Sequence, residues 1–483
     1  MYKSTNMSKR LTKFTFVGAL ACTFMVSSIG LVNADGHGVY GPFPITEKSY
    51  NGPKKNSVSY GGQIARQLQH NGLKKLASKG NPNDPTNGPE KKMLSYLNTK
   101  DKSQTLAILD PAPNSSKFPI KQKMIGELSG GANLSGKADK RIQTSWPGFM
   151  SGVDVIKFMI KKAGKTKGGV DTRNGMNYPQ LISKYTMGAV LYHQACDNYL
   201  DEKMTADSKP NNKPYKKGAY YTGKEHSWDE AFGYWGAAAH TMKLTAAQSY
   251  DIAKKKDLKA ADYNNDGVVD LKTEMTYAHA YYASSYDKTG KTNYLKNVTK
   301  AFIDGRKLIT SANGNKLSKA QLDKIQDYVQ IICGNWEDVI AESVFKYAGS
   351  TYKALGKIEK ALETGSGMDA AMSKYLKYWG ELKGFAMALQ SGPNNTSDTF
   401  NRLNRMMGFG PLMPNLSQVI GIDSSGNYIK DQGSSIGYYK VHMLKIQKLM
   451  AKEYALKAKV NDATGGMAAL LEKVGTKKSA END

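Results

Sequence analysis

The sequence predicts an all-α fold in which long antiparallel helices form one or two packed helical bundles. Three observations support this prediction. Several long segments repeat apolar residues at spacings of three and four, the pattern of a helix with one buried face. Helix-capping residues stand where such segments begin. An alternating apolar and polar pattern, which is typical of strands, is almost absent from the sequence.

The composition limits the class of protein. The chain has 483 residues, of which 40% are hydrophobic and 23% charged, enough for one large domain or two ordinary ones. A mean hydropathy of −0.54 excludes a protein with many membrane spans. There are 68 Lys and Arg against 42 Asp and Glu, so the formal net charge is +26. The lysines are spread along the chain, which indicates a solvated basic surface and favours anionic surfaces or ligands as partners.

The first 34 residues are expected to be an export signal and not part of the fold. A basic start precedes an apolar run that ends at Val32-Asn33-Ala34, which resembles a signal-peptidase site. Cleavage after Ala34 would place the mature protein in the periplasm or on the cell surface, where we expect no nucleic-acid partner. Two alternatives stay open: an uncleaved anchor, and a lipoprotein processed at Cys22.

The rest of the chain is divided by composition. Residues 35–56 are rich in Gly and Pro and predict an extended leader. Residues 57–461 are expected to form one helical-bundle domain. The last segment, 462–483, predicts a flexible tail.

The strongest helix prediction begins at Ser318. Ser318 and Gln321 form a capping box, apolar residues then recur every three or four positions, and Gly349 is a suitable end. Other helices are expected at residues 149–164, 178–200, 223–236, 352–364, 368–390 and 435–460.

Two cysteines remain after the predicted signal is removed. Cys196 and Cys333 both lie on apolar faces of predicted helices. In an oxidising compartment such a pair is expected to form a disulfide. The alternative is two buried free thiols.

The stretch DYNNDGVVDLKTE, residues 262–274, gathers oxygen-bearing side chains around one glycine. It follows the spacing D-x-[DN]-x-[DN]-G of a calcium-binding loop, in which alternate residues turn toward one cation. The expected ligands are Asp262, Asn264, Asp266, the backbone carbonyl of Val268, Asp270 and Glu274. The glutamate stands one position later than in an EF-hand. We expect a structural calcium ion between two helices; the alternative is an Asn/Asp/Gly turn with Asp270 as a helix N-cap.

A second acidic group lies in GKEHSWDEAFGYWG, residues 223–236. His226, Asp229 and Glu230 could together hold a second metal ion or a ligand. The local alternative is a capping box between Ser227 and Glu230, with Asp229 in the first helical turn. Both interpretations stay open at this point.

Several segments together resemble an uncharacterised family of exported bacterial proteins with a domain of unknown function. They are YGGQIARQLQHNGL, YPQLISKYTMGAVLYHQACDNYL, HSWDEAFGYWG, DYNNDGVVDLKTE and YWGELKGFAMALQ. A more remote similarity to the imelysin-like proteins implies two packed helical bundles and a link to periplasmic iron or haem uptake. The suspected metal motif of that group, G-x-H-x-x-E, is matched loosely by His226 and Asp229: Asp stands in place of Glu, and Gly223 lies three residues before the His instead of two. Glu381, within YWGELKG, is the candidate to face His226 from another helix.

The sequence therefore favours an exported, calcium-stabilised helical binding protein, an accessory to the uptake of iron, haem or another nutrient. Its ligand is expected to be anionic or a metal complex. The chain has no H-E-x-x-H, nucleophile elbow, Walker or Rossmann motif. Two alternatives remain: a metal-dependent hydrolase that uses the His226 group, and a structural envelope protein whose basic surface faces lipid or peptidoglycan.

Overall fold

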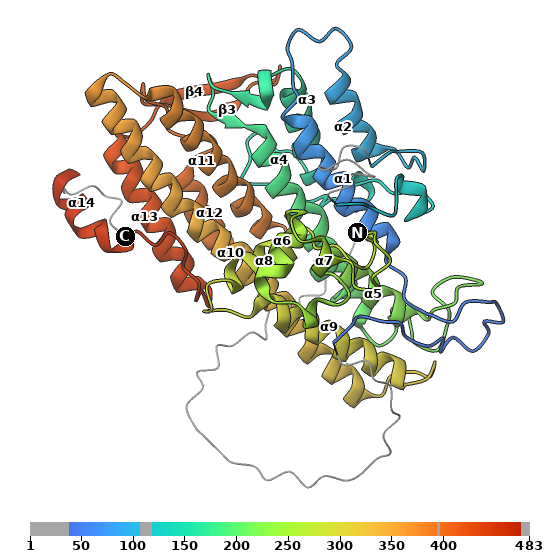
Figure 1. Cartoon of the computed structure of the whole chain (residues 1–483). Coiled ribbons are helices and arrows are strands. Elements are labelled where there is room, and N and C mark those ends of the chain that lie inside the picture. Colours follow the sequence, from blue (N-terminus) through green and yellow to red (C-terminus); the bar gives the residue numbers. More distant parts are fainter. Residues whose placement is uncertain (1–37, 107–117, 394–396, 475–483) are drawn as a thin grey trace, which may run out of the picture. The chain divides into compact units, whose positions relative to one another are not determined.

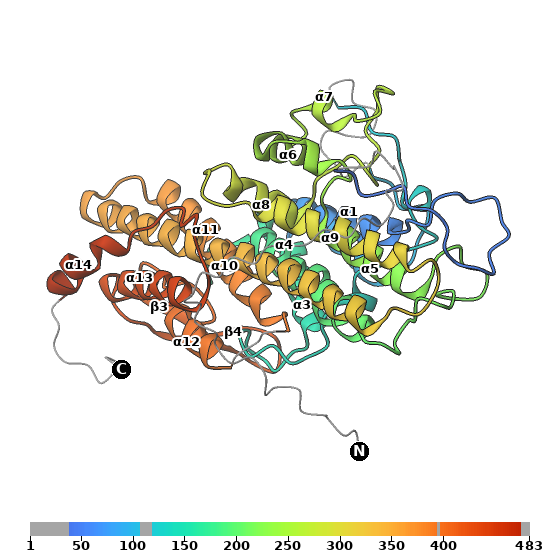
Figure 2. The same cartoon turned by 90° about the horizontal axis from the view of Figure 1, so that it is seen from below.

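A computed structural model describes residues 38–106, 118–393 and 397–474, and Figures 1 and 2 show it from two directions. These residues are mainly helical, as predicted. The predicted export signal, with Cys22 and the cleavage after Ala34, lies outside the described residues, as do residues 475–483 of the predicted tail. None of the described helices is long and apolar enough to cross a lipid bilayer.

The elements follow one another along the chain with mostly short connections. The α-helices are α1 Gly61–Ala77, α2 Gly88–Asn98, α3 Gly152–Gly164, α4 Tyr178–Thr186, α5 Gly223–Trp235, α6 Ala246–Ala253, α7 Leu258–Ala261, α8 Ala278–Asp287, α9 Tyr294–Ser311, α10 Lys319–Thr364, α11 Met368–Gln390, α12 Ser397–Met407, α13 Ile436–Glu453 and α14 Met467–Val474. The 3-10 helices are η1 Ile125–Glu127, η2 Ser135–Lys137, η3 Lys167–Gly169, η5 Glu202–Met204, η6 Thr241–Lys243 and η7 Thr464–Gly466, and η4 Met187–Tyr199 is a π-helix. The strands are β1 Val170–Asp171, β2 Met176–Asn177, β3 Ser417–Ile422 and β4 Tyr428–Gln432.

Helix α10 is the central helix of the fold, and other long helices pack on it. Its 46 residues correspond to a length of about 69 Å, and α9, α11 and α13 pack along it. Figures 1 and 2 both show α11 and α13 beside α10. Helix α11 packs in turn on α4, and the π-helix η4, which continues α4, packs on α5. A single apolar core runs through all of these helices.

The two ends predicted for the strongest helix have different outcomes. The capping box is confirmed, because Ser318 Oγ accepts a hydrogen bond from Gln321 N and the Gln321 side chain accepts one from Ser318 N. The predicted end at Gly349 is wrong, since α10 continues to Thr364. A Cβ at Gly349 would lie 2.0 Å from the carbonyl oxygen of Asn461. The absence of a side chain at Gly349 therefore leaves room for the segment that contains Asn461, and the helix continues past this glycine.

The strands form two small antiparallel sheets, β1–β2 and β3–β4. The β3–β4 hairpin contains an irregularity between Val419 and Gly421. The sequence prediction of almost no strand missed this hairpin, although its segment is rich in Val, Ile and Tyr on either side of the turn DSSGN.

Both ends of the described chain pack on the core. Residues 38–56 contain no helix or strand, yet the ring of Tyr40 stacks on Phe232 with 3.7 Å between centroids. At the other end, Met467 and Leu470 of α14 are buried against α13. The segment predicted as a flexible tail thus contains a packed helix up to Val474.

Residues 454–463, which we name the C-terminal strap, close over α10. The carboxylate of Glu342, a buried residue of α10, accepts hydrogen bonds from the backbone N–H groups of Lys457, Ala458 and Lys459 at 2.7–2.9 Å. Gln447 of α13 donates to the carbonyl oxygen of Asn461 at 3.1 Å. Tyr294 OH of α9 also donates to Glu342, at 3.4 Å, and the strap supplies the three backbone donors that complete the partners of this buried carboxylate.

Candidate functional site

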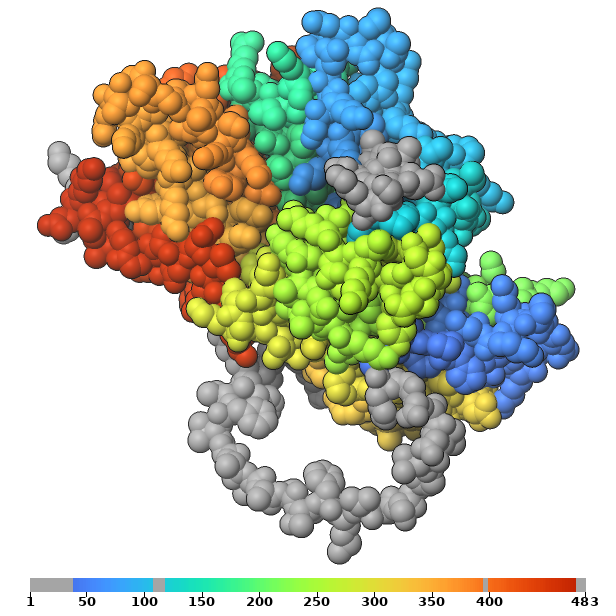
Figure 3. Space-filling model, viewed as in Figure 1, coloured from blue at the N-terminus to red at the C-terminus, as the bar shows by residue number. Residues whose placement is uncertain are grey.

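The predicted calcium loop lies between α7 and α8. Asp262 Oδ1 and Oδ2 accept hydrogen bonds from the backbone N–H groups of Asp266 and Gly267 at 3.1 and 2.9 Å. Asn264 Oδ1 also accepts from Asp266 N, at 2.9 Å. Gly267 has φ +83°, a conformation that glycine adopts without strain. The loop thus brings the side chains of Asp262, Asn264 and Asp266 together, and Figure 3 shows this yellow-green part of the chain at the surface.

The other two predicted side-chain ligands have different partners. Asp270 accepts a hydrogen bond from Gln122 Nε2 at 2.9 Å and lies 3.3 Å from Lys121 Nζ. Glu274 is buried and accepts from the backbone N–H groups of Tyr263 and Asp270. Burial raises the pKa of Glu274. Glu274, which was predicted as a ligand, therefore ties the two ends of the loop together through its contacts with the backbone.

The loop also holds a distant segment of the chain. Ile120 and Val269 form a parallel β-bridge, with Val269 N donating to Pro119 O at 2.9 Å and Lys121 N donating to Val269 O at 3.0 Å. Nothing in the sequence signalled this pairing, because the two segments are far apart along the chain. Across the described residues, no group of three or more His, Cys, Asp or Glu side chains is arranged to hold a metal ion.

Helix α5 begins earlier than the capping box predicted at Ser227. Thr222 is the N-cap: its hydroxyl accepts from Glu225 N at 3.2 Å, and Glu225 Oε2 accepts from Thr222 N at 2.9 Å. Ser227 is inside the helix and buried. The sequence offers the same spacing at Thr222/Glu225 and at Ser227/Glu230, and the structure uses the first.

Asp229 belongs to a buried ion group and not to a site with His226. Arg306 of α9 is fully buried and lies 3.0 Å from both Asp229 Oδ1 and Glu225 Oε1. Tyr40 OH donates to Asp229 Oδ1 at 2.7 Å, and Ser59 N donates to Oδ2 at 3.0 Å. Burial raises the pKa of Asp229, and Arg306 opposes that shift. These contacts use both oxygens of the carboxylate to join the leader, α5 and α9.

His226 and Glu230 do lie together. The distance from His226 Nε2 to Glu230 Oε1 is 3.7 Å, and Gln63 donates to the same oxygen at 2.8 Å. The His226 ring stacks on Tyr221 with 4.1 Å between centroids. Burial lowers the pKa of His226 more than Glu230 raises it, whereas a cationic imidazole would need the opposite balance. His226 and Glu230 therefore form a buried polar contact that packs against the ring of Tyr221.

The structure places Glu381 with lysines and not with His226. Glu381 Oε1 lies 3.9 Å from Lys184 Nζ, in the contact between α11 and α4. Further lysines from α1, the end of α6, α10 and α11 act on the same carboxylate or on Lys184. We name this group the lysine cluster: Lys74, Lys184, Lys254, Lys346, Lys377 and Glu381. This cluster was not predicted from the sequence, because each lysine taken alone looks like a solvated surface residue.

Lys184 is the centre of the lysine cluster. Its side chain is almost fully buried, and its ammonium group lies 5.4 Å from the ring centroid of Tyr282 and 5.9 Å from that of Phe385. A Cβ on Gly384 would lie 2.6 Å from Lys184 Cβ, so the glycine gives the lysine its space. Burial lowers the pKa of Lys184, against the effect of Glu381. The positive charge of Lys184, together with burial, lowers the pKa of Lys74 to about 7.

The two cysteines are joined. Cys196 in η4 and Cys333 in α10 form a disulfide with 5.8 Å between their Cα atoms, within the usual range for such bonds. The bond connects the π-helix to the central helix. The predicted calcium loop lies in the stretch of chain between the two cysteines.

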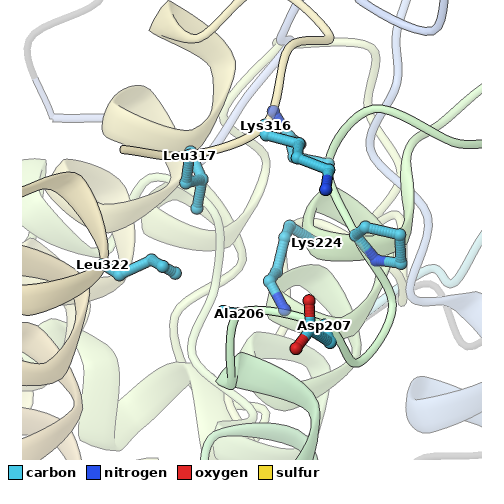
Figure 4. A pocket seen from close by; sticks show the side chains of 8 residues that line it. Ala206, Asp207, Lys224, Lys316, Leu317 and Leu322 are labelled. Atoms are coloured by element: carbon cyan, nitrogen blue, oxygen red, sulfur yellow. The ribbon is translucent and has the colours of Figure 1, made fainter. Parts of the chain in front are cut away.

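A small cavity lies beside Lys224, as Figure 4 shows. Its volume is about 130 Å³, and Asp207 and Lys316 also line it. Lys224 Nζ donates to the backbone carbonyls of Lys203 at 2.8 Å and Thr205 at 2.5 Å. The cavity is smaller than most ligand sites, and its lysine already holds the loop that precedes α5.

A family model described as a domain of unknown function, DUF4856, matches residues 157–341. The matched region includes Lys184, His226, the predicted calcium loop and both cysteines, whereas Glu381 lies beyond it. No curated protein and no solved structure matches the chain. The predicted similarity to an uncharacterised family agrees with this match, and the similarity to imelysin-like proteins stays a prediction.

Proposed function

We propose that the chain is an exported, calcium-stabilised helical protein that binds an anionic ligand through the lysine cluster, as an accessory to nutrient uptake. The observation that carries the proposal is the charge imbalance of this cluster. Among the charges that act most strongly on Lys74, Lys184 and Lys346, Glu381 is the one acid. Glu381 is thus the single acid among lysines from α1, α4, the end of α6, α10 and α11.

Such an imbalance destabilises the unliganded protein. Like charges brought together in a partly buried region repel, and burial removes the water that would screen them. The lowered pKa values of Lys74, Lys184 and Lys346 express that cost. A bound anion would reverse it, because an opposite charge favours the protonated form of each lysine.

The cluster is built so that a ligand can reach it. Lys184 is buried and Lys74 and Lys346 are half-buried, whereas Lys254 and Lys377 are exposed. Positive charge thus extends from the surface inward to the Lys184 ammonium. Lysine ammonium groups bind phosphate and carboxylate groups as compact point charges. We therefore propose an oxyanion of two or more charges, either free or as part of a larger molecule.

Calorimetry with pyrophosphate at low salt tests this site. The protein is expected to bind pyrophosphate, and the double variant Lys254→Met/Lys377→Met, which changes only exposed side chains, is expected to bind about tenfold more weakly or worse. Lys184→Met is expected to abolish binding. Because the pKa of Lys74 is about 7 without ligand, binding near that pH is expected to take up protons, seen as heats that depend on the buffer.

Lys319→Met is the matched control. Lys319 is exposed on the same helix as Lys346 but about 40 Å away, at roughly 1.5 Å per residue, and it pairs with Asp323. This variant is expected to bind pyrophosphate like the unchanged protein. Equal binding by the exposed double variant, or no binding of pyrophosphate, phosphate or sulfate by the unchanged protein, would contradict the proposed site.

The calcium part of the proposal is supported by the loop geometry. Asp262, Asn264 and Asp266 present oxygens within one tight turn, and the carbonyl of Val268 is the further ligand expected from the spacing. Water is needed to complete the coordination, since Glu274 is used by the backbone. The ion would hold the loop that positions Val269 against Ile120.

Removal of calcium is therefore expected to lower the melting temperature. At a calcium concentration about 100 times Kd, binding to the folded state alone adds about 2.7 kcal/mol to stability. Scanning calorimetry with a chelator and then with excess calcium measures the difference. Asp266→Ala should remove the calcium response, while Asp323→Ala, an exposed acid of α10, should keep it. The same melting curve with chelator and with calcium would refute the claim.

The disulfide and the basic composition support the proposed export. A disulfide is stable in an oxidising compartment and rare in the cytosol, and the structure contains one. The basic composition also suits a protein that meets anionic ligands outside the cytoplasm.

A further inference from the structure

The molecule has an apolar groove whose lining residues are distant in sequence from the predicted calcium loop. It has a volume of about 430 Å³ and is lined on one side by residues 142–149. On the other side it is lined by Phe409, which follows α12, and by the β3–β4 hairpin through Ile420, Ile422 and Ile429. Neither the family match nor the lysine cluster assigns it a role.

Exposed apolar side chains gather at this groove. Eight large hydrophobic side chains are exposed in the described part of the chain, and Ile142, Phe149, Ile420 and Ile429 all line the groove. Phe149 is 91% exposed. An exposed apolar patch of this kind is typical of an interaction site, whereas single exposed apolar side chains are not.

The backbone holds Phe149 outward. Its φ is +52°, and that of the preceding Gly148 is +95°. Phenylalanine rarely adopts this region, and such a conformation persists where the surrounding structure imposes it. Close by, Trp146 is buried and packs edge-on against Phe158 of α3. The segment that presents Phe149 to solvent is therefore anchored three residues earlier by a buried aromatic side chain.

The segments around the groove are basic. Residues 140–173 and 397–432 carry eleven Lys or Arg and five Asp, with no Glu. Lys140 is exposed two residues before Ile142, and Arg402 and Arg405 are exposed on α12, just before Phe409; Arg141, in contrast, is paired with Asp139 and Asp197. This combination complements a surface that is apolar inside and negatively charged outside. An anionic lipid bilayer has that chemistry, because apolar insertion and attraction of basic residues to lipid headgroups add together.

We propose that the groove face docks on an anionic lipid bilayer, with Phe149 and Ile420 entering the boundary between headgroups and acyl chains. The docking is peripheral, since it uses side chains of a loop and a hairpin. It would keep the protein at a membrane surface while other parts of the chain remain in solvent.

Sedimentation with lipid vesicles tests the proposal. The protein is expected to bind vesicles of phosphatidylethanolamine and phosphatidylglycerol, and to bind phosphatidylcholine vesicles at least about tenfold more weakly. Phe149→Ser/Ile420→Ser is expected to lower the partition coefficient on anionic vesicles about tenfold or more. Added salt should weaken the binding of the unchanged protein.

Ile331→Ser/Leu362→Ser is the control, because these side chains are also exposed but lie on α10. It should bind vesicles like the unchanged protein. Equal binding by the groove variant and the control, or equal binding to both kinds of vesicle, would overturn the proposal. So would a protein that ignores vesicles but forms a dimer which Phe149→Ser dissociates, since the face would then join two copies of the chain.

Discussion

Replacing Arg306 by Met is expected to lower the free energy of unfolding by about 3–5 kcal/mol. The guanidinium group is fully buried between the carboxylates of Glu225 and Asp229, at 3.0 Å from each. Met has a similar length and fills the space, so the loss would be electrostatic. Two buried carboxylates would remain with no cation beside them, and a buried charge without a partner is costly.

Urea unfolding followed by circular dichroism measures this loss. Lys300→Met is the matched control, since Lys300 pairs with Asp304 on the exposed side of the same helix, α9. Exposed pairs contribute at most about 1 kcal/mol. Adding Glu225→Gln and Asp229→Asn to Arg306→Met should recover part of the stability, because the charges that lost their partner are then gone. A cost for Arg306→Met no larger than that for Lys300→Met would show that the ion group does not stabilise the fold.

Loss of the disulfide is expected to have the second large effect. The bond joins residues 137 apart in sequence, so it restricts the unfolded chain strongly, and removal of such a bond costs about 2–5 kcal/mol. The double variant Cys196→Ala/Cys333→Ala keeps two small apolar side chains at the buried positions. Its melting temperature should fall well below that of the oxidised protein.

Reduction provides the control for this prediction. The unchanged protein, unfolded and refolded with a thiol reductant, should melt close to the double variant, and the reductant should not affect the variant itself. Equal melting temperatures for the oxidised protein and the double variant would contradict the expected contribution. A single Cys196→Ala change should cost about as much as the double change, because either one removes the bond.

The local features of the fold were predictable where one sequence segment decides them. The capping box at Ser318 and the whole of α11 depend on neighbouring residues, and both were found. The capping box of α5 was not, because Thr222/Glu225 and Ser227/Glu230 have the same spacing. The choice between them is made by Arg306, which requires Glu225 and Asp229 on the buried side of α5. That requirement comes from another helix and leaves no local signal.

The lysine cluster was missed for the same reason, although one signal for it was present. Its lysines come from α1, α4, α6, α10 and α11, so no single segment looks unusual. Gly380 and Gly384, four residues apart in YWGELKG, mark where α11 approaches α4 closely. A pair of glycines at this spacing in a helix favours close contact with another chain segment. Read in that way, the pair predicts that Glu381 faces a buried neighbour.

The C-terminal strap has a consequence for the order in which the protein can fold. The three backbone donors to Glu342 stand 115 to 117 residues later in the chain, so α10 cannot complete its buried contacts until those residues are available. Contacts between such distant residues form slowly, because the long intervening loop must close first. A chain that crosses a membrane from its N-terminus would deliver the strap last. Its central helix would therefore stay incomplete, with Glu342 still solvated, until almost the whole chain had emerged.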